Sequence, residues 1–346
     1  MSTIPSAIAR RAFLRRSAIA SLSAGAARAS TATRPERPGR LPREVWIATI
    51  AQDGMTGTTP AALTRETLAR MEAAAAQQPD LVCLPEMFLF PGGAGSRPPV
   101  REIAEAPLGE LAAPFVAFAK SHQCYVAYSG YTVEAGRYYN AVVIIDRQGR
   151  PCGEYRKTYP TVGEMEYGVS PGPLQPPVFE TDFGRVGAQI CFDVEWHDGW
   201  RRLRDAGAEI VCFPSAFAAG RAVNMRACQN QLVVASSTRK DTSKIVDVTG
   251  EPLAATSRWN RWACAAVNLE KTFLHTWPFN ARFPDIHSKY GRDVVITTYA
   301  EEEWSIIESR SPDVRVADIL REFELETYAD TMARAERLQI ENRAPT

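Results

Sequence analysis

The sequence has no excess of charge of either sign. Its 346 residues include 40 Lys or Arg and 40 Asp or Glu, so the formal net charge is zero. A protein without an overall field has no long-range attraction for nucleic acid or for an anionic membrane surface. We therefore expect no nucleic-acid partner, and a small molecule is the default partner.

The chain also lacks the cysteine patterns of disulfide frameworks and metal sites. Its seven cysteines are odd in number and widely spaced, with no C-x-x-C pair and no histidine at metal-ligand spacing. Most lie in apolar runs, where a free cysteine acts as a small hydrophobe. The four histidines are scattered and none is assigned to catalysis. We expect no metal and no organic cofactor.

The sequence also has no apolar run long enough to span a membrane, including at the start of the chain. Arg10 and Arg11 precede Phe13-Leu14 and a short alanine-rich stretch that ends in Ala27-Arg28-Ala29. That order is typical of a twin-arginine export signal with an A-x-A cleavage site, although a basic tail is the alternative. The stretch is too short to span a bilayer, so we expect no stable membrane anchor. The predicted location is periplasmic or secreted, with residues 1–29 as the signal.

The remaining chain divides by composition. Residues 30–43 are rich in proline and arginine, which is typical of a linker. Residues 44–272 alternate strand-like and helix-like segments, with hairpin turns that predict a mixed sheet and an α/β fold. Residues 273–346 form a C-terminal extension whose last part is charged and helical in pattern. We expect this extension to pack on a neighbouring subunit.

Three segments of the body each end an expected strand with a reactive side chain. They are Asp80-Leu-Val-Cys-Leu-Pro-Glu86, Tyr155-Arg-Lys157 and Gly187-Ala-Gln-Ile-Cys191-Phe-Asp193. In this order, together with segments 170–172 and 207–215, they resemble the nitrilase (carbon-nitrogen hydrolase) superfamily over residues 45–270. The resemblance implies a four-layer α-β-β-α sandwich, hydrolysis through a thioester at Cys191, and a homodimer or larger homo-oligomer.

The chemistry of the three side chains agrees with this resemblance. A thiol with a pKa of about 8.5 needs a base or a cation beside it to act as a nucleophile at neutral pH. Glu86 can take the thiol proton and return it to the leaving amine. Lys157 can stabilise the oxyanion. Taken alone, Glu86 and Lys157 would be solvated strand ends and Cys191 a core thiol, but the three together favour an active site with activity around neutrality.

The resemblance also implies a further glutamate between Lys157 and Cys191. Glu164 has the better spacing from Lys157, and Glu166 stays open because alternate loop positions face opposite ways. The backbone N–H of Phe192 is expected to complete the oxyanion hole. Asp193 and Glu195 are interpreted as acidic residues at an exposed helix start.

Aromatic side chains are expected at the rim of the pocket, where the resemblance places them. The substrate-contact candidates, with Glu166, are Phe88, Phe192, Trp196 and Phe217.

The residues after the nucleophile bear on the substrate. True nitrilases tend to have Cys-Trp-Glu-Asn, whereas this chain has Cys191-Phe-Asp-Val194, which is closer to the amidase and carbamoylase branches. We therefore expect a small linear amide as the substrate. The alternatives are a nitrilase or N-carbamoyl amidohydrolase with the same trio, and a catalytically silent exported protein that binds a small ligand.

Overall fold

The computed structural model describes residues 39–92 and 96–343. The expected export signal, residues 1–29, and most of the expected linker lie outside the described residues. The end of that linker is packed against the body, because Arg43 donates to Glu209 Oε1 over 2.5 Å and Arg40 forms an ion pair with Asp80.

Two six-stranded mixed sheets form the body, and in each of them central parallel strands are flanked by antiparallel ones. The first sheet has the order β12 (Trp262–Asn268), β1 (Glu44–Ile50), β2 (Leu81–Cys83), β3 (Tyr125–Glu134), β4 (Arg137–Ile145) and β5 (Pro151–Arg156). The second has the order β11 (Pro252–Ala255), β10 (Lys244–Val246), β9 (Val233–Thr238), β8 (Ile210–Ser215), β7 (Arg185–Ala188) and β6 (Phe179–Glu180).

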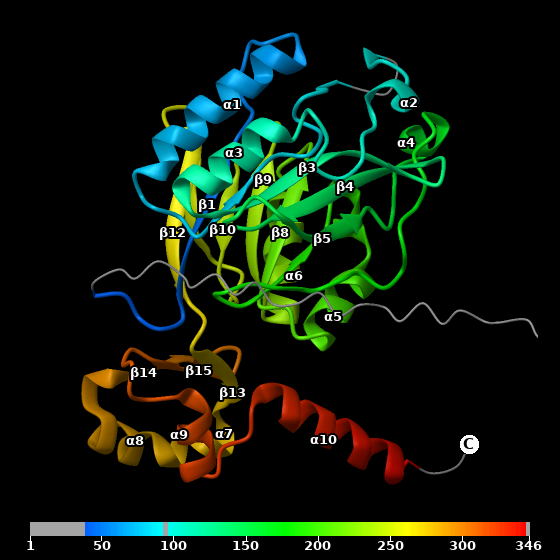
Figure 1. Cartoon of the computed structure of the whole chain (residues 1–346). Coiled ribbons are helices and arrows are strands. Elements are labelled where there is room, and N and C mark those ends of the chain that lie inside the picture. The colour runs from blue at the N-terminus through cyan, green and yellow to red at the C-terminus, as the bar shows by residue number, and fades with distance from the viewer. Residues whose placement is uncertain (1–38, 93–95, 344–346) are drawn as a thin grey trace, which may run out of the picture.

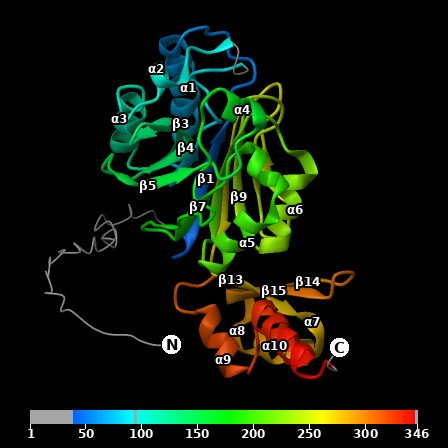
Figure 2. The ribbon, with the colours of Figure 1, turned by 90° about the vertical axis from the view of Figure 1, so that its right-hand side faces the viewer.

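The sheets pack face to face, with helices on both outer faces (Figure 2). Helices α1 (Pro60–Ala75) and α3 (Ala113–His122) cover the first sheet, and α5 (His197–Asp205) and α6 (Gly220–Asn230) cover the second. Fully buried side chains such as Ile47, from the first sheet, meet Ile210 and Val233, from the second, in the core between them. The expected four-layer α-β-β-α sandwich is confirmed.

A third sheet with its own helices follows the sandwich (Figure 1). Its strands have the order β13 (Lys271–His275), β15 (Trp304–Ser309) and β14 (Val294–Tyr299). The remaining elements are α7 (Thr276–Phe279), η3 (Asn280–Arg282), α8 (Phe283–Tyr290), η4 (Gly291–Asp293), α9 (Val316–Glu322) and α10 (Tyr328–Glu341). The pattern of the sequence predicts the helices near the end but not the strands.

This C-terminal unit lies at one end of the sandwich (Figures 1 and 2). The short helices α2 (Val100–Ile103) and α4 (Val162–Glu166) lie in loops at the other end. Within residues 39–92 and 96–343, the helices are all too short or too polar to cross a bilayer.

Candidate active site

The three reactive side chains lie where strands of the two facing sheets end. Glu86 follows β2, and Lys157 comes directly after β5 at the edge of the same sheet. Cys191 follows β7 of the second sheet and opens the 3₁₀ turn η2 (Cys191–Glu195). Its φ of 47° lies in the left-handed region, which a non-glycine residue adopts only when its surroundings hold it there. The turn therefore fixes the direction of the thiol.

One cavity of about 310 Å³ brings the expected catalytic groups together. Its lining includes Glu86, Lys157, Cys191 and Glu164, and all but Glu164 are buried. This volume lies at the small end of the range for small-molecule sites.

Lys157 is held between two carboxylates. Its Nζ donates to Glu86 Oε1 over 2.9 Å and to Glu164 Oε2 over 2.7 Å. Asn140, on β4, donates its Nδ2 to the same two carboxylates over 2.8 and 2.7 Å. Glu164 is itself fixed, because it forms a capping box with Thr161 at the start of α4. The ammonium group therefore has a set position with one flank open to the cavity.

Burial and charge set the protonation states of this group. Burial alone would raise the pKa of Glu86, but the positive charges of Lys157 and Arg239 outweigh it and lower the pKa. Burial would likewise lower the pKa of Lys157, and the two glutamates reverse that effect and raise it. Burial, followed by the charge of Glu86, raises the pKa of Cys191 to about 12. In the resting site the carboxylate and the ammonium are charged and the thiol keeps its proton.

The thiol is surrounded by hydrogen-bonding groups. The Glu86 carboxylate, the Ser215 side chain and the backbone N–H of Ala216 all lie close enough to influence the pKa of the thiol or of its neighbouring carboxyl. A carboxylate beside a neutral thiol is the arrangement that general-base activation needs.

Asp193 connects the nucleophile to the strand end that carries Lys157. Its Oδ2 accepts from Ile190 N over 2.8 Å and from the Tyr155 hydroxyl over 2.7 Å, and its Oδ1 accepts from Tyr159 N over 2.8 Å. The interpretation of Asp193 as an exposed helix-start residue is wrong, because the side chain is fully buried. Its hydrogen bonds join the segment that carries Cys191 to the segment that carries Lys157.

None of the residues predicted to contact substrate lines this cavity. Phe88 is fully buried and packs edge-on against Phe115 and Tyr128, between the first sheet and its helices. Glu166 is exposed on α4, so Glu164 is the glutamate that the structure brings to Lys157.

The remaining three aromatic candidates also lie outside the lining. Trp196 stacks on Tyr159 with 4.4 Å between ring centroids and meets Phe192 edge-on, which makes an aromatic cluster next to the nucleophile turn. Phe217 is 39% exposed, and its neighbour Ala216 lines the cavity instead.

The site residues that the sequence did not reveal include Asn140, which bonds to Glu86, and the cavity residues Arg97 and Arg239. Asn140 had a usable signal, since it is a polar residue at the start of the apolar run Ala141–Ile145 of β4. Arg239 directly follows β9 and therefore ends a strand, as the three reactive residues do. However, Arg239-Lys-Asp241 has the composition of a solvated turn. Arg97 lies in a proline-rich loop with no periodicity.

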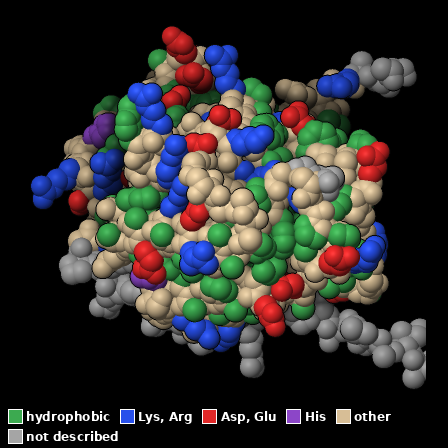
Figure 3. Space-filling model, turned by 90° about the horizontal axis from the view of Figure 1, so that it is seen from above, with side chains coloured by type: hydrophobic (Ala, Val, Ile, Leu, Met, Phe, Trp, Pro, Cys, Tyr) green, Lys and Arg blue, Asp and Glu red, His purple; other side chains and the backbone are tan. Residues whose placement is uncertain are grey.

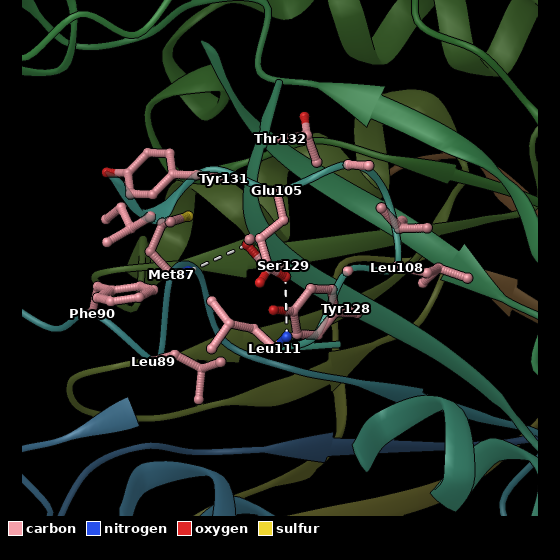
Figure 4. A pocket seen from close by; sticks show the side chains of 15 residues that line it. Met87, Leu89, Phe90, Glu105, Leu108, Leu111, Tyr128, Ser129, Tyr131 and Thr132 are labelled. Carbon is pink, nitrogen blue, oxygen red and sulfur yellow. Dashed lines mark hydrogen bonds between the residues drawn. The ribbon is translucent and has the colours of Figure 1, made fainter. Parts of the chain in front are cut away.

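A second cavity lies behind the loop that carries Glu86 (Figure 4). Its volume is about 10 Å³, room for about one water molecule, so it is too small for a substrate. Ser129, on β3, lines it and accepts a hydrogen bond from Met87 N over 3.2 Å, which ties the Glu86 loop to the sheet. In the part of the chain that the structure describes, no cluster of three or more His, Cys, Asp or Glu could hold a metal ion.

Known proteins resemble this chain in sequence and in fold. The sequence profile of the family described as carbon-nitrogen hydrolase matches residues 47–272. A Pseudomonas protegens protein named "Hydrolase in pqqF 5'region" is 37% identical over 165 residues, 45% of this chain and 57% of that protein. A Mus musculus deaminated glutathione amidase is 31% identical over 182 residues, 44% of this chain and 56% of that protein. The chain thus spans little more than half the length of either relative.

A solved structure shows the same fold. The carbon-nitrogen hydrolase from Helicobacter pylori G27 has a TM-score of 0.60 to this chain at 22% identity, covering 66% of this chain and 90% of that one.

Proposed function

Because the chain belongs to the carbon-nitrogen hydrolase family, we propose that it hydrolyses a small linear amide through a thioester on Cys191. The observation that supports this most strongly is the meeting of Cys191, Glu86 and a doubly paired Lys157 around one cavity. The sequence after the nucleophile, which is closer to the amidase and carbamoylase branches, favours an amide over a nitrile.

Acylation begins with the thiol proton. Glu86 takes this proton as the Cys191 sulfur attacks the amide carbon, and the carbonyl oxygen becomes an oxyanion. The Lys157 ammonium donates to that oxyanion, with the Phe192 N–H as the proposed second donor. Collapse of the intermediate breaks the C–N bond, and the Glu86 carboxyl gives its proton to the leaving amine. The product of this half-reaction is a thioester and an amine.

Deacylation uses the same groups. Glu86 removes a proton from a water molecule that attacks the thioester carbon, and Lys157 again stabilises the oxyanion. The C–S bond breaks, the sulfur regains the proton from Glu86, and a carboxylic acid leaves. Glu164 and Asn140 act as positioning residues in both halves, since they hold Lys157 and Glu86 in place.

The test is mass spectrometry of the protein and of Cys191→Ala after brief incubation with amides, nitriles and carbamoyl compounds. We expect an acyl adduct on Cys191 in the wild type alone, with ammonia and a carboxylic acid released from the amides. Turnover of nitriles or carbamoyl compounds in place of amides would reassign the substrate. No adduct or turnover with any compound, from folded protein with a reduced thiol, would show a silent binding protein.

Export and assembly are proposals that come from the sequence alone. We propose that residues 1–29 direct twin-arginine export to the periplasm or beyond, and that the mature protein is a homodimer or larger homo-oligomer. Replacing Arg10 and Arg11 together by lysine should block export in cell fractionation. Light scattering of the purified protein should give a mass of at least twice the monomer mass.

A further inference from the structure

The active-site cavity contains two arginines that the proposed mechanism does not use. Arg97 and Arg239 line it together with Cys191 and Lys157. Its charged lining residues are three cations and two carboxylates, and both carboxylates are already paired with Lys157. Positive charge is therefore left over on the two guanidinium groups. A small, partly enclosed cavity seldom keeps such an excess of positive charge unless an anion enters it.

Arg239 is held close to the nucleophile by its backbone. It follows β9, and its N–H donates to Ser215 O over 2.9 Å, next to the residue whose N–H faces the thiol. Its Nε and Nη1 atoms are buried and have no hydrogen-bond partner among the described residues. A buried charged donor without a partner destabilises the protein more than a neutral donor does. Such a cost is removed when a ligand supplies the missing acceptor.

Arg97 approaches the same space from the loop before α2. Its Nη2 donates to Gly92 O over 2.7 Å, and its Nη1 donates to the Tyr131 hydroxyl. Its Nε is buried and has no partner among the residues described. These contacts fix the guanidinium plane before any ligand arrives, which lowers the entropy lost on binding.

The two arginines act on each other. Burial, and to a smaller extent the charge of Arg97, lowers the pKa of Arg239, while the charge of Glu86 opposes this. Two like charges that repel in a cavity both gain when an anion sits between them. A carboxylate fits that place well, because its two oxygens can each accept from a guanidinium group.

We propose that the substrate is an amide that also carries a carboxylate group, with the carboxylate bound by Arg239 and Arg97 and the amide carbon next to Cys191. This assignment rests on the proposed amide hydrolysis and narrows its substrate class. The carboxylate fixes one end of the molecule and so orients the amide for attack. Neutral amides of the same length lack this anchor.

The test that does not depend on turnover is binding to the Cys191→Ala protein, measured by calorimetry. The probes are a series of dicarboxylic acid monoamides, neutral amides of matched length, and inorganic phosphate. We expect some monoamide to bind at least about 10-fold more tightly than its neutral counterpart, and this preference to disappear in Cys191→Ala/Arg239→Gln. The matched control is Cys191→Ala/Arg201→Gln, which removes an exposed arginine on α5 and should keep the preference.

Three results would overturn the inference. Equal binding of neutral and anionic amides would do so, as would a preference that survives Arg239→Gln. Phosphate that binds as tightly as every monoamide would indicate a general anion site in place of a carboxylate–amide site.

Turnover by the protein with Cys191 intact is measured in parallel. Hydrolysis of neutral and anionic amides at equal kcat/KM would leave the proposed function standing and remove the inference. Arg239-dependent binding of monoamides without hydrolysis would support the anion site and remove the proposed function.

Discussion

At the scale of single residues, Glu86 and Cys191 share one transferable proton. The lowered pKa of Glu86 and the raised pKa of Cys191 leave that proton on sulfur. Its transfer to Glu86 moves a negative charge by one hydrogen bond and leaves the net charge of the buried site unchanged, so little solvation is lost. Ordinary pKa values predict activity around neutrality. The lowered pKa of Glu86 extends the pH range of activity to lower pH, and the raised pKa of Cys191 extends it to higher pH.

Removing the charge of Glu86 should make the Cys191 thiol more acidic and, at the same time, slow turnover strongly. In Glu86→Gln the amide oxygen can still accept from Lys157 and Asn140, but the anion beside the sulfur is gone. We expect the alkylation midpoint of Cys191 with iodoacetamide to move to lower pH, and kcat to fall by roughly 10²–10⁴-fold because the base is lost. Mass spectrometry of the Cys191 peptide measures the first effect.

The matched control for this experiment is Glu166→Gln, which removes an exposed carboxylate from α4. It should leave both the midpoint and kcat unchanged. A midpoint in Glu86→Gln that stays in place or rises would show that Glu86 does not hold the thiol in its neutral form.

Asn140 gives a second prediction at this scale. An aspartate at position 140 would place a third carboxylate within hydrogen-bonding distance of Glu86 and Glu164. Because like charges raise carboxyl pKa values, the acid limb of the kcat/KM profile should move up by about one pH unit or more in Asn140→Asp. In Asn140→Ala only a donor is lost, so the shift should be smaller. An acid limb in Asn140→Asp at or below that of the wild type would contradict this.

The sequence identifies those site residues that stand in a motif at the end of a predicted strand. Glu86, Lys157 and Cys191 each end a strand in a motif, and strand ends gather at one edge of a sheet. Their roles remain predictions. Arg97 and Asp193 are placed by contacts with residues far away in the chain, such as Tyr131, 34 positions from Arg97, and Tyr155, 38 positions from Asp193. No local pattern encodes such contacts.

At the scale of elements, Asp193 links the turn η2, which follows the second sheet, to the end of β5 in the first sheet. Three donors converge on its carboxylate, yet burial dominates and raises its pKa to about 6. An unfolded chain would have an aspartate pKa of about 3.9. Because the folded carboxyl holds its proton more tightly, its contribution to stability is fully present below about pH 4 and is lost as the pH rises through about 6.

Asp193→Asn removes this titration and so isolates it. The free energy of unfolding of the wild type minus that of the variant should fall by about 2 kcal/mol between about pH 4 and pH 7. Urea unfolding of both proteins across this range measures the difference. Glu195→Gln, an exposed carboxylate of the same turn, is the comparison variant. A difference for Asp193→Asn that is constant or grows with pH would show that the buried carboxyl is not the group that titrates.

Elements differ in how well their sequences reveal them. Helix α1 begins at Pro60, a residue type favoured in the first turn of a helix, and Thr59 caps it by accepting from Ala62 N over 3.2 Å. Strands β14 and β15 gave no comparable signal. β14 is largely half-exposed, and β15 is buried on both faces, so neither shows a clear period of two. Strand β15 packs against the core of the sandwich on one face and against the core of the C-terminal unit on the other. Because both faces are apolar, its sequence does not alternate and gives no sign of a strand.

At the scale of the whole molecule, α2 and α4 lie at one end of the sandwich and the C-terminal unit lies at the other (Figures 1 and 2). Helix α4 carries Glu164, so the site belongs to the end away from the C-terminal unit. The face seen from above, at the end that carries α2 and α4, mixes basic, acidic and apolar side chains without a dominant sign (Figure 3). This agrees with the zero net charge and leaves selection of an anionic substrate to the cavity.

The C-terminal unit is joined to the sandwich through one face of its sheet. Phe273 and Ile306 belong to the core between the two large sheets, whereas Leu274 and Ile307 belong to the core of the unit itself. The Lys271–Asp247 ion pair, with 2.6 Å between Nζ and Oδ1, reinforces the junction. Neighbouring residues of one strand thus serve two different cores, because successive side chains point to opposite faces.

This alternation predicts different effects for two matched variants of β15. Ile306→Ala and Ile307→Ala remove the same atoms, and each should cost about 2–5 kcal/mol of stability. In Ile307→Ala, hydrogen exchange should rise throughout the unit, including α8 and α9, because its own core is opened. In Ile306→Ala, exchange should rise only in β15 and the sandwich strands it meets, while α8 and α9 stay protected. Both variants should keep kcat/KM within about twofold, since the site lies at the far end. Equal loss of protection in α8 and α9 for the two variants would show that the two faces of this sheet form one cooperative core.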